Sequence, residues 1–345
     1  MILFFTSPIG LGHATRDIAI LDKLKRDTDD AIVLVSGDAA YKLITKKGFT
    51  VLDLYKPKSC MVSSGQLSHP LRWLIKYISY YRECKTIAEA VIGKNKDICN
   101  LVVSDEDFAS ISASEDVSVS KRVLITDITE THFTKGVSSI IERWMNKSMR
   151  KLMRMCDLVI IPGDGDDYEN ITHVGPIARE ITDGRDILRK KFSLERKTIL
   201  VSVGGTGSGQ YLIEKSLEAF RNLRKRMDID LIVVSGPSLK LTDGVDFRSA
   251  GFVDNLHEYI FASDLVISLA GRSTIDESTI YGTPGIFIPI KKHYEQEENA
   301  KRFGYRYQDI YRLETLVEEK LCLQRAHPRS INGSSKAAKL ISKFI

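Results

Sequence analysis

The sequence predicts an α/β fold with two domains, each built around a parallel sheet. Short β-branched and apolar runs alternate with longer amphipathic segments along nearly the whole chain, a pattern typical of β-α units. The chain has 345 residues, 43% of them hydrophobic, which is enough for two cores. A polar stretch rich in glycine and proline interrupts the alternation near residues 163 to 180. We therefore expect two Rossmann-like domains joined by a linker.

The first series of β-α units precedes this interruption. It predicts an N-terminal domain over residues 1–165 and a linker over residues 166–180. The polar run from Gly163 to Asp167 could bind a cation, but a solvated hinge is the favoured interpretation. The expected strands are Ile2–Thr6, Ala31–Ser36, Thr50–Leu54, Ile98–Val103, Arg122–Thr126 and Leu158–Ile161.

The second series predicts a C-terminal domain over residues 181–330. After about residue 312 the pattern is helical only, and a C-terminal helix over residues 331–345 can pack back across the linker onto the N-terminal domain. The expected strands lie near Thr198–Val203, Asp230–Ser235, Arg248–Phe252, Leu265–Leu269 and Gly285–Pro289.

The composition argues against a membrane-spanning, secreted, nucleic-acid-binding or zinc-binding protein. No apolar run approaches the roughly 18 residues of a membrane-spanning helix, and the N-terminus lacks the pattern of a signal peptide. The 50 basic and 45 acidic residues are intermixed, so no nucleic-acid partner is indicated. The five cysteines have no C-x-x-C spacing, which fits reduced thiols and no zinc site. We expect a cytoplasmic protein, and the residues predict no oligomeric state.

The first loop that could bind a ligand or take part in catalysis joins the opening strand to a helix that starts near His13. Gly10 and Gly12 let a ligand approach the backbone closely. The positive end of the helix keeps the His13 ring neutral, as a general base requires. A capping or packing role is the alternative for this histidine.

The second loop, Gly204–Gly209, follows a predicted strand and precedes a predicted helix. Gly205, Thr206 and Ser208 would offer backbone N–H groups and hydroxyls to an anion. The loop is neither a Walker A motif nor a dinucleotide fingerprint. Phosphate or sugar contact is favoured over a simple tight turn.

The third loop brings Arg272 together with Ser273 and Thr274 at the start of another helix. This combination suits a diphosphate. Glu277 lies one turn further on, where its carboxylate could accept hydrogen bonds from ribose hydroxyls. An exposed, solvated glutamate is the alternative.

Taken in order, the three loops resemble the GT-B glycosyltransferases, especially glycosyltransferase family 28, which adds N-acetylglucosamine to lipid-linked peptidoglycan precursors, and its archaeal relatives. The resemblance is strongest over Gly251–Leu256, Asp264–Thr274, Glu277–Pro284 and Glu295–Ala300. It implies two domains that face a central cleft, with the nucleotide sugar held by the C-terminal domain.

The resemblance also implies a UDP-sugar as donor and the contacts with it, residue by residue. Phe252 and Val253 would border the uracil, Glu277 the ribose, and Glu295 and Gln296 the donor sugar. The diphosphate would meet the second loop (Gly205, Thr206 and Ser208) and Arg272, Ser273 and Thr274. Gly10 and Gly12 would also contact the donor.

These roles imply an inverting glycosyltransferase that needs no metal or other cofactor. His13 would act as base and Arg272 would stabilise the leaving diphosphate. Asp105, Glu106 and Asp127 all follow strands of the first domain and could orient the histidine, and Asp127 is preferred.

Other activities stay open. The Gly12–Arg16 run reads Gly-His-x-x-Arg, where the family often has proline in place of the arginine. It is similar to the UDP-sugar hydrolase of pseudaminic acid synthesis. A UDP-sugar 2-epimerase of the same fold and a non-catalytic nucleotide-sugar-binding subunit are further alternatives.

Two segments bear on the acceptor. Leu71–Val91 and Ile140–Met155 carry aromatic side chains among basic ones, a composition that can rest on an anionic membrane surface. Packing against the core is the alternative. With membrane contact, the protein would be peripheral on the inner face of the cell membrane and its hydroxyl acceptor lipid-linked.

Overall fold

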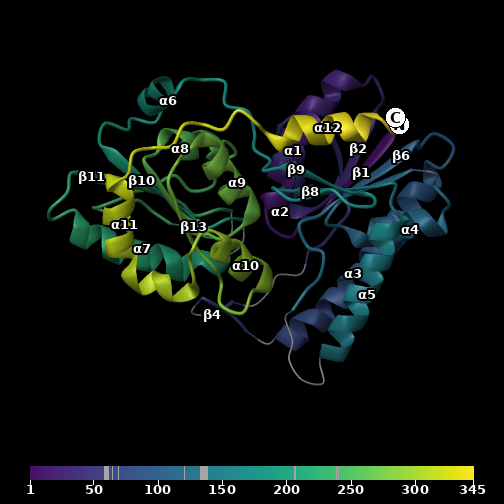
Figure 1. The fold of residues 1–345 in the computed structure, drawn as a ribbon, viewed down its shortest axis with the longest axis horizontal. Helices are drawn as coiled ribbons and strands as arrows, with labels where there is room; N and C mark the ends of the chain where they lie inside the picture. Colours follow the sequence, from purple (N-terminus) through teal and green to yellow (C-terminus); the bar gives the residue numbers. More distant parts are fainter. Residues whose placement is uncertain are drawn as a thin grey trace. The chain divides into compact units, whose positions relative to one another are not determined.

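The computed structural model describes residues 1–57, 62–63, 65–68, 70–119, 121–132, 139–205, 207–237, 239 and 241–345. The chain divides into two compact units (Figure 1). Unit 1 consists of Met1–Cys60, His69–Ile177 and Asn332–Ile345, and unit 2 of Met61–Ser68 and Ala178–Ile331. The chain therefore passes from one unit to the other after residues 60, 68, 177 and 331.

Unit 1 is built on a parallel seven-stranded sheet of order β3-β2-β1-β6-β7-β8-β9. The order reverses between β1 and β6, and ligands of open parallel sheets bind at the carboxyl ends of the strands at such a point. The strands are β1 (Ile2–Thr6), β2 (Ile32–Ser36), β3 (Thr50–Asp53), β6 (Leu101–Asp105), β7 (Arg122–Ile125), β8 (Leu158–Pro162) and β9 (Ile171–Gly175).

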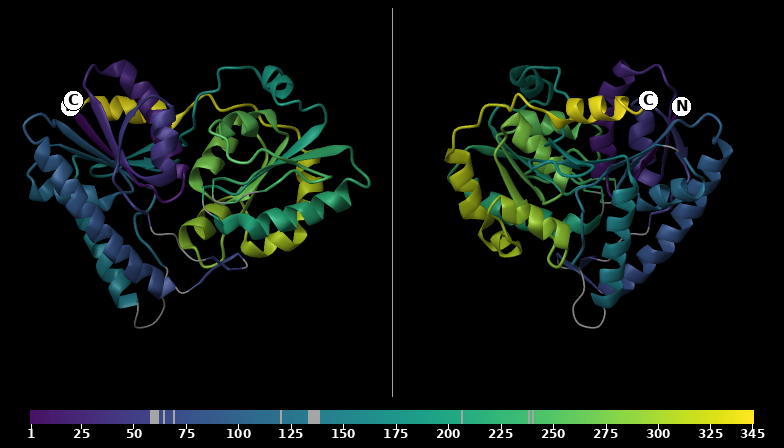
Figure 2. Two further views of the ribbon diagram at one scale, coloured as in Figure 1. Left: turned by 180° about the vertical axis from the view of Figure 1, so that it is seen from behind. Right: turned by 45° about the vertical axis from the view of Figure 1, so that its right-hand side comes forward.

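Helices cover both faces of this sheet (Figure 2). Alternate side chains of β1 point to opposite faces, so Ile2 and Phe4 enter one core while Leu3 and Phe5 enter the other. The first face is covered by α1 (Gly12–Asp27), α2 (Asp38–Lys46) and α12 (Gly333–Ser342). The second is covered by α3 (Pro70–Lys94), α4 (Phe108–Asp116) and α5 (Ser139–Met155).

Unit 2 repeats the plan with a parallel five-stranded sheet of order β12-β11-β10-β13-β14. Its strands are β10 (Lys197–Ser202), β11 (Ile229–Val234), β12 (Arg248–Ser249), β13 (Leu265–Leu269) and β14 (Gly285–Ile288). One face packs against α6 (Arg185–Lys191), α8 (Leu256–Ala262) and α9 (Arg272–Tyr281). The other carries α7 (Gln210–Leu223) and α11 (Leu313–Cys322), and α10 (Tyr294–Arg302) follows β14. Short 3-10 turns, η2 (Gly207–Gly209) and η3 (Tyr307–Arg312), precede α7 and α11.

A small hairpin from the first part of the sequence belongs to unit 2. It consists of β4 (Val62–Ser63) and β5 (Gln66–Leu67). The Leu67 N–H donates to the carbonyl of Lys291 (3.0 Å), and the Lys291 N–H donates to the carbonyl of Gly65 (2.9 Å). The hairpin thus attaches to the segment between β14 and α10.

The predicted α/β fold with two parallel-sheet domains is confirmed, while some boundaries differ. The predicted linker over residues 166–180 is wrong in part, because it contains β9, which pairs with β8 and completes the sheet of unit 1. The strand expected at Ile98–Val103 starts only at Leu101, since the Ile98 N–H bonds back to Asn95 in a turn. The C-terminal helix is α12, which packs on α1 in unit 1.

Candidate functional site

His13 and Asp105 form the centre of the site in unit 1. His13 lies in the first turn of α1 with its side chain 22% exposed, and Asp105 is the fully buried last residue of β6. The Nδ1 atom of His13 is 3.0 Å from Oδ1 of Asp105. A neutral His13 that donates its Nδ1–H to this carboxylate leaves Nε2 as a proton acceptor. This is the arrangement of a general base with an orienting carboxylate.

Arg16 binds both oxygens of the same carboxylate, and its Nη2 lies 3.2 Å from Nδ1 of His13. Its Nε donates to Oδ2 of Asp105 (2.8 Å), a second guanidinium nitrogen bonds Oδ1, and a third reaches Asp127 at 3.4 Å. Burial would raise the pKa of Asp105, but the charge of Arg16 and the contacts with His13 outweigh it and lower that pKa. Asp105 is therefore ionised at neutral pH and can stabilise an imidazolium.

Asp127, the preferred orienting group, is not the carboxylate bonded to Nδ1 of His13; that residue is Asp105. The reason is strand order. Asp105 ends β6, which pairs directly with β1, whereas Asp127 follows β7, one strand further away. Asp127 contacts Arg16 instead, so the expected direct partnership with His13 is corrected.

Glu106, the third candidate, positions the loop that carries Asp127. Its carboxylate accepts hydrogen bonds from Thr126 Oγ1 (2.7 Å) and from the Asp127 N–H (2.8 Å). Burial and then the nearby Asp127 charge raise the pKa of Glu106. Its backbone has φ of 56°, a left-handed conformation that non-glycine residues adopt at a cost and often near functional sites.

The glycine loops lie at the carboxyl ends of β1 and β10. Gly10 and Gly12 belong to the His13 loop, and Gly10 has a left-handed φ of 81°. Gly205 and Ser208 lie between β10 and α7, whereas Thr206 falls outside the described residues.

The loop between β10 and α7 is held in place by close packing against the backbone at Gly236. A Cβ atom on Gly236 would lie 2.1 Å from the carbonyl oxygen of Gly204, and Gly236 itself has φ of 75°. Only glycine therefore fits this position.

Arg272, Ser273 and Thr274 form the first turn of α9, as expected. The N–H groups at such a helix start attract anions. The guanidinium of Arg272 is held by Asp276, with Nε 2.9 Å from Oδ1. Because β10, β13 and β14 are neighbours, the Gly205 loop, the α9 start and the α10 start lie along one edge of the unit 2 sheet.

Glu277 is not the exposed glutamate that was one alternative. Its side chain is 4% exposed, and its carboxylate accepts hydrogen bonds from Nε (2.8 Å) and Nη2 (3.4 Å) of Arg179. Arg179 also donates to the carbonyl of Asp254 (2.8 Å). Sequence reasoning missed Arg179, because its partner Glu277 lies 98 positions away in the chain and only the fold brings the two together. Ribose contact by Glu277 stays a prediction.

The remaining predicted donor residues differ in exposure. Phe252 is 42% exposed, as a ring that borders a base would be, while Val253 packs partly against the unit 2 core. Glu295 and Gln296 begin α10, where the amide oxygen of Gln296 accepts from the Ile290 N–H (3.0 Å). Their contacts with a donor stay predictions.

Part of the chain matches a known family model. Residues 198–338 match the glycosyltransferase family 28 C-terminal domain, a range that contains the second and third loops. The chain carries a family 28 glycosyltransferase domain. The chain is also similar to an uncharacterized glycosyltransferase of Methanopyrus kandleri, with 29% identity over 59% of this chain. The match spans 60% of that relative's length.

Two further likenesses extend over more of the chain. The UDP-N-acetylglucosamine--N-acetylmuramyl-(pentapeptide) pyrophosphoryl-undecaprenol N-acetylglucosamine transferase of Caldicellulosiruptor saccharolyticus is 22% identical over 84% of this chain and 78% of its own. The crystal structure of the kitacinnamycin glycotransferase has a TM-score of 0.65 at 14% identity, covering 100% of this chain and 98% of that one. The structural likeness confirms the GT-B fold.

Two features are absent from the described residues. No group of three or more His, Cys, Asp or Glu side chains in them could hold a metal ion. Nor is any helix in that part of the chain both long and apolar enough to cross a membrane.

Proposed function

We propose that this family 28 protein is an inverting, metal-independent glycosyltransferase that moves a sugar from a UDP-sugar to a hydroxyl group of an acceptor. The observation that carries the proposal is the contact between His13 and Asp105 in a chain whose other unit is a family 28 domain. The name of the relative from Caldicellulosiruptor saccharolyticus, which specifies a UDP-sugar donor, supports the choice of nucleotide.

In the proposed reaction, His13 takes the proton that the acceptor loses, and Asp105 stabilises the resulting positive charge. Nε2 of His13 takes the acceptor's hydroxyl proton, and the acceptor oxygen attacks the anomeric carbon from the face opposite the diphosphate. The bond from that carbon to the diphosphate breaks, and UDP leaves with the electron pair. Asp105 stabilises the imidazolium that forms.

The leaving diphosphate meets positive partial charges in unit 2. The N-terminus of α9, which begins at Arg272, and the loop before α7 offer backbone N–H groups. Arg272 adds a full positive charge, and its partner Asp276 fixes its position. These groups supply the stabilisation for which other enzymes use a metal, which supports metal independence.

The test is to incubate the protein with a panel of UDP-sugars, with and without candidate acceptors and lipid extract, and with and without EDTA. We expect acceptor-dependent UDP release that EDTA leaves unchanged and that His13→Ala lowers by about 10² to 10⁴. His132→Ala, at a histidine that is 56% exposed, is the control.

Each alternative has its own result in this assay. UDP release without acceptor would indicate a hydrolase, and conversion into a second UDP-sugar would indicate an epimerase. UDP binding in a thermal-shift screen with no turnover in any assay would indicate a binding subunit. Loss of activity in EDTA that added metal restores would overturn metal independence.

We also propose that unit 1 touches an anionic membrane surface through α5 and the start of α3. Trp144 and Ile140 of α5 are 67% and 57% exposed, and Ile75 of α3 is 58% exposed. Between Arg143 and Arg154, α5 also carries several cationic side chains. Exposed aromatic and aliphatic groups among cations suit an anionic lipid surface. This contact supports a lipid-linked acceptor and a peripheral location on the inner face of the cell membrane.

A further inference from the structure

A second buried carboxyl group contacts Asp105. Asp17 lies on α1, one turn after His13, and its side chain is fully buried. Its carboxyl lies within hydrogen-bonding reach of the Asp105 carboxyl, which in turn contacts Nδ1 of His13. The three side chains therefore follow one another in the order Asp17, Asp105, His13.

The contact between the two carboxyl groups requires a proton. Carboxylates only accept hydrogen bonds, so two of them can bond to each other only if one is protonated. Asp105 keeps its charge, because Arg16 donates to it (2.8 Å) and His13 contacts it. As a carboxylate, Asp17 would have no donor: among the described residues neither of its oxygens has a hydrogen-bond partner, and the nearby Thr6 hydroxyl is likewise unbonded. The proton therefore resides on Asp17, which donates it to Asp105.

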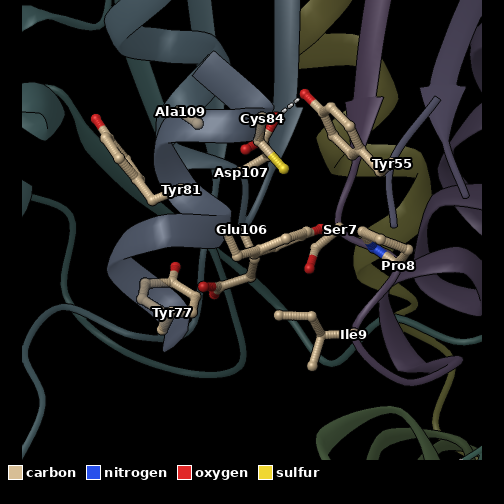
Figure 3. A pocket seen from close by; sticks show the side chains of 11 residues that line it. Ser7, Pro8, Ile9, Tyr55, Tyr77, Tyr81, Cys84, Glu106, Asp107 and Ala109 are labelled. Atoms are coloured by element: carbon tan, nitrogen blue, oxygen red, sulfur yellow. Dashed lines mark hydrogen bonds between the residues drawn. The ribbon is translucent and has the colours of Figure 1, made fainter. Parts of the chain in front are cut away.

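The two other acids near Arg16 form a separate pair. The carboxyl of Glu106 lies within hydrogen-bonding reach of that of Asp127. Glu106 also borders a small space lined by Ser7 and Tyr77 (Figure 3). This pair reaches Arg16 through Asp127, at 3.4 Å. The Asp105 carboxyl, which contacts His13, therefore has the carboxyl of α1 as its own partner.

The proton on Asp17 controls the charge beside the imidazole. With it, the positive charge of Arg16 and the negative charge of Asp105 balance each other. Without it, the buried group would carry an excess negative charge, which favours a protonated imidazole. A general base must be unprotonated before the reaction, so this excess charge would remove His13 from use.

The hydrogen bond from Asp17 acts in the same direction. Each donor to the Asp105 carboxylate spreads its negative charge and weakens its hold on an imidazolium. Asp17 and His13 both lie against this one carboxylate, so the first moderates what the carboxylate does to the second.

We propose that Asp17 is a positioning residue that holds a proton against Asp105 and so keeps His13 unprotonated and available as a base. Because Asp17 is fully buried, it acts through Asp105 and not on a substrate. The inference rests on the proposed transferase function for the role of His13 as base. The location of the proton does not depend on that function.

The first test locates the proton without turnover. Infrared spectra of the full chain at pH 7 compare the unmodified protein with Asp17→Asn, and labelling with ¹³C-aspartate separates the aspartic acid carbonyls from those of glutamic acid. We expect the unmodified protein to absorb as a protonated aspartic acid and Asp17→Asn to lose the absorption of one such group. Asp22→Asn, at an exposed carboxyl of the same helix, is the matched control and should keep it.

The second test measures the charge of His13. Asp17→Asn keeps a donor beside Asp105, whereas Asp17→Leu has a similar shape and no donor. We expect the acid limb of the kcat/KM profile for sugar transfer to move to higher pH by at least about 0.5 unit in Asp17→Leu, and by less than about 0.2 unit in Asp17→Asn. Asp17→Ala replaces the leucine variant if that one does not fold.

Ring ¹⁵N chemical shifts of His13 give the same information without turnover. The imidazolium fraction at a given pH should be higher in Asp17→Leu than in Asp17→Asn and the unmodified protein. A purely structural role of Asp17 would lower stability or rate in both variants and would move neither the limb nor the ring shifts.

The outcomes separate this inference from the proposed function. Equal protonated-acid absorption in the unmodified protein and Asp17→Asn would overturn the location of the proton. Unchanged His13 ring shifts in Asp17→Leu would overturn the positioning role. If both spectra change as expected in a protein that transfers no sugar, the transferase function alone is wrong. If transfer proceeds and the acid limb of Asp17→Leu stays in place, the positioning role is wrong while the function stands.

Discussion

Nδ1 of His13 lies 3.0 Å from Oδ1 of Asp105, a residue 92 positions later in the chain. The contact exists because β1 and β6 are adjacent, so the loop after one strand meets the last residue of the other. It fixes which ring nitrogen is available to a substrate.

Asp105→Asn tests that contact. The amide cannot hold the imidazolium, so we expect kcat for sugar transfer to fall about 10² to 10⁴-fold with little change in donor KM. Asp127→Asn removes the carboxylate charge 3.4 Å from Arg16 without touching the bond between Asp105 and His13, so it should cost less than about 10-fold. Initial rates at saturating donor measure both. Equal losses in the two variants would contradict the assignment of Asp105.

Asp17 makes stability depend on pH. Burial first, and then the charge of Asp105, raise the pKa of Asp17, so the folded protein keeps a proton that the unfolded chain releases. The stability from this group is complete below the unfolded pKa of about 3.9 and is lost as pH rises toward the folded pKa. Asp17→Asn mimics the protonated form and should reduce the fall in unfolding free energy between pH 5 and pH 8. Urea denaturation at the two pH values measures it; an unchanged pH slope would argue against it.

Arg179 should be essential to the stability of unit 2. Arg179→Ala leaves the buried Glu277 carboxylate without its cation, which costs about 3 to 5 kcal/mol. In calorimetry we expect Tm to fall by roughly 6 °C or more. The control is Arg196→Ala, which removes a half-exposed arginine paired with Asp228 and should cost less than about 1 kcal/mol. A loss no larger than the control's would refute the structural role of the pair.

Gly236→Ala should weaken nucleotide binding. The added Cβ would clash with the Gly204 carbonyl and demand a strained left-handed alanine, so the loop before α7 must shift. We expect the Kd for UDP to rise at least about 10-fold by calorimetry, a change of about 1.4 kcal/mol. Gly184→Ala, where a Cβ meets no atom within 4 Å, is the control. An unchanged Kd would mean that this loop does not hold the diphosphate.

Trp144→Ser combined with Ile140→Ser tests the membrane proposal. Removing two exposed apolar side chains should lower binding to vesicles with anionic lipid at least about 10-fold, since each buried side chain contributes about 1.5 to 3 kcal/mol. Ile187→Ser removes a side chain 59% exposed in unit 2 and should have no effect. Vesicle sedimentation at two salt concentrations measures binding. Failure of the unmodified protein to sediment would contradict the proposal.

Sequence reasoning predicted the fold well where apolar runs were unambiguous. Ile2–Thr6 and Leu265–Leu269 match β1 and β13 residue for residue. β9 was missed because glycine and proline on both sides hide a strand in which only Ile171 and Val174 are buried. The hairpin at β4 and β5 is too short to produce a periodic pattern.

The site was harder to predict from the sequence than the fold. The residues identified three carboxylates that follow strands, but the choice among them depends on the order of β1, β6 and β7, which loop lengths do not reveal. Arg16 was noted as a departure from the family pattern, yet its bonds to Asp105 and Asp127 required the fold. Likewise Asp276 and Arg179 are found only through their partners.

The β4–β5 hairpin and α12 determine which segments must be exchanged to make a chimaera of this protein and a relative. A chimaera that exchanges only residues 178–331 would leave behind β4 and β5, which bond to Lys291 of unit 2. One that exchanges everything after residue 177 would also replace α12, which completes the core of unit 1. A folded hybrid with a new unit 2 must therefore transfer two separate pieces of sequence and retain the native C-terminal helix.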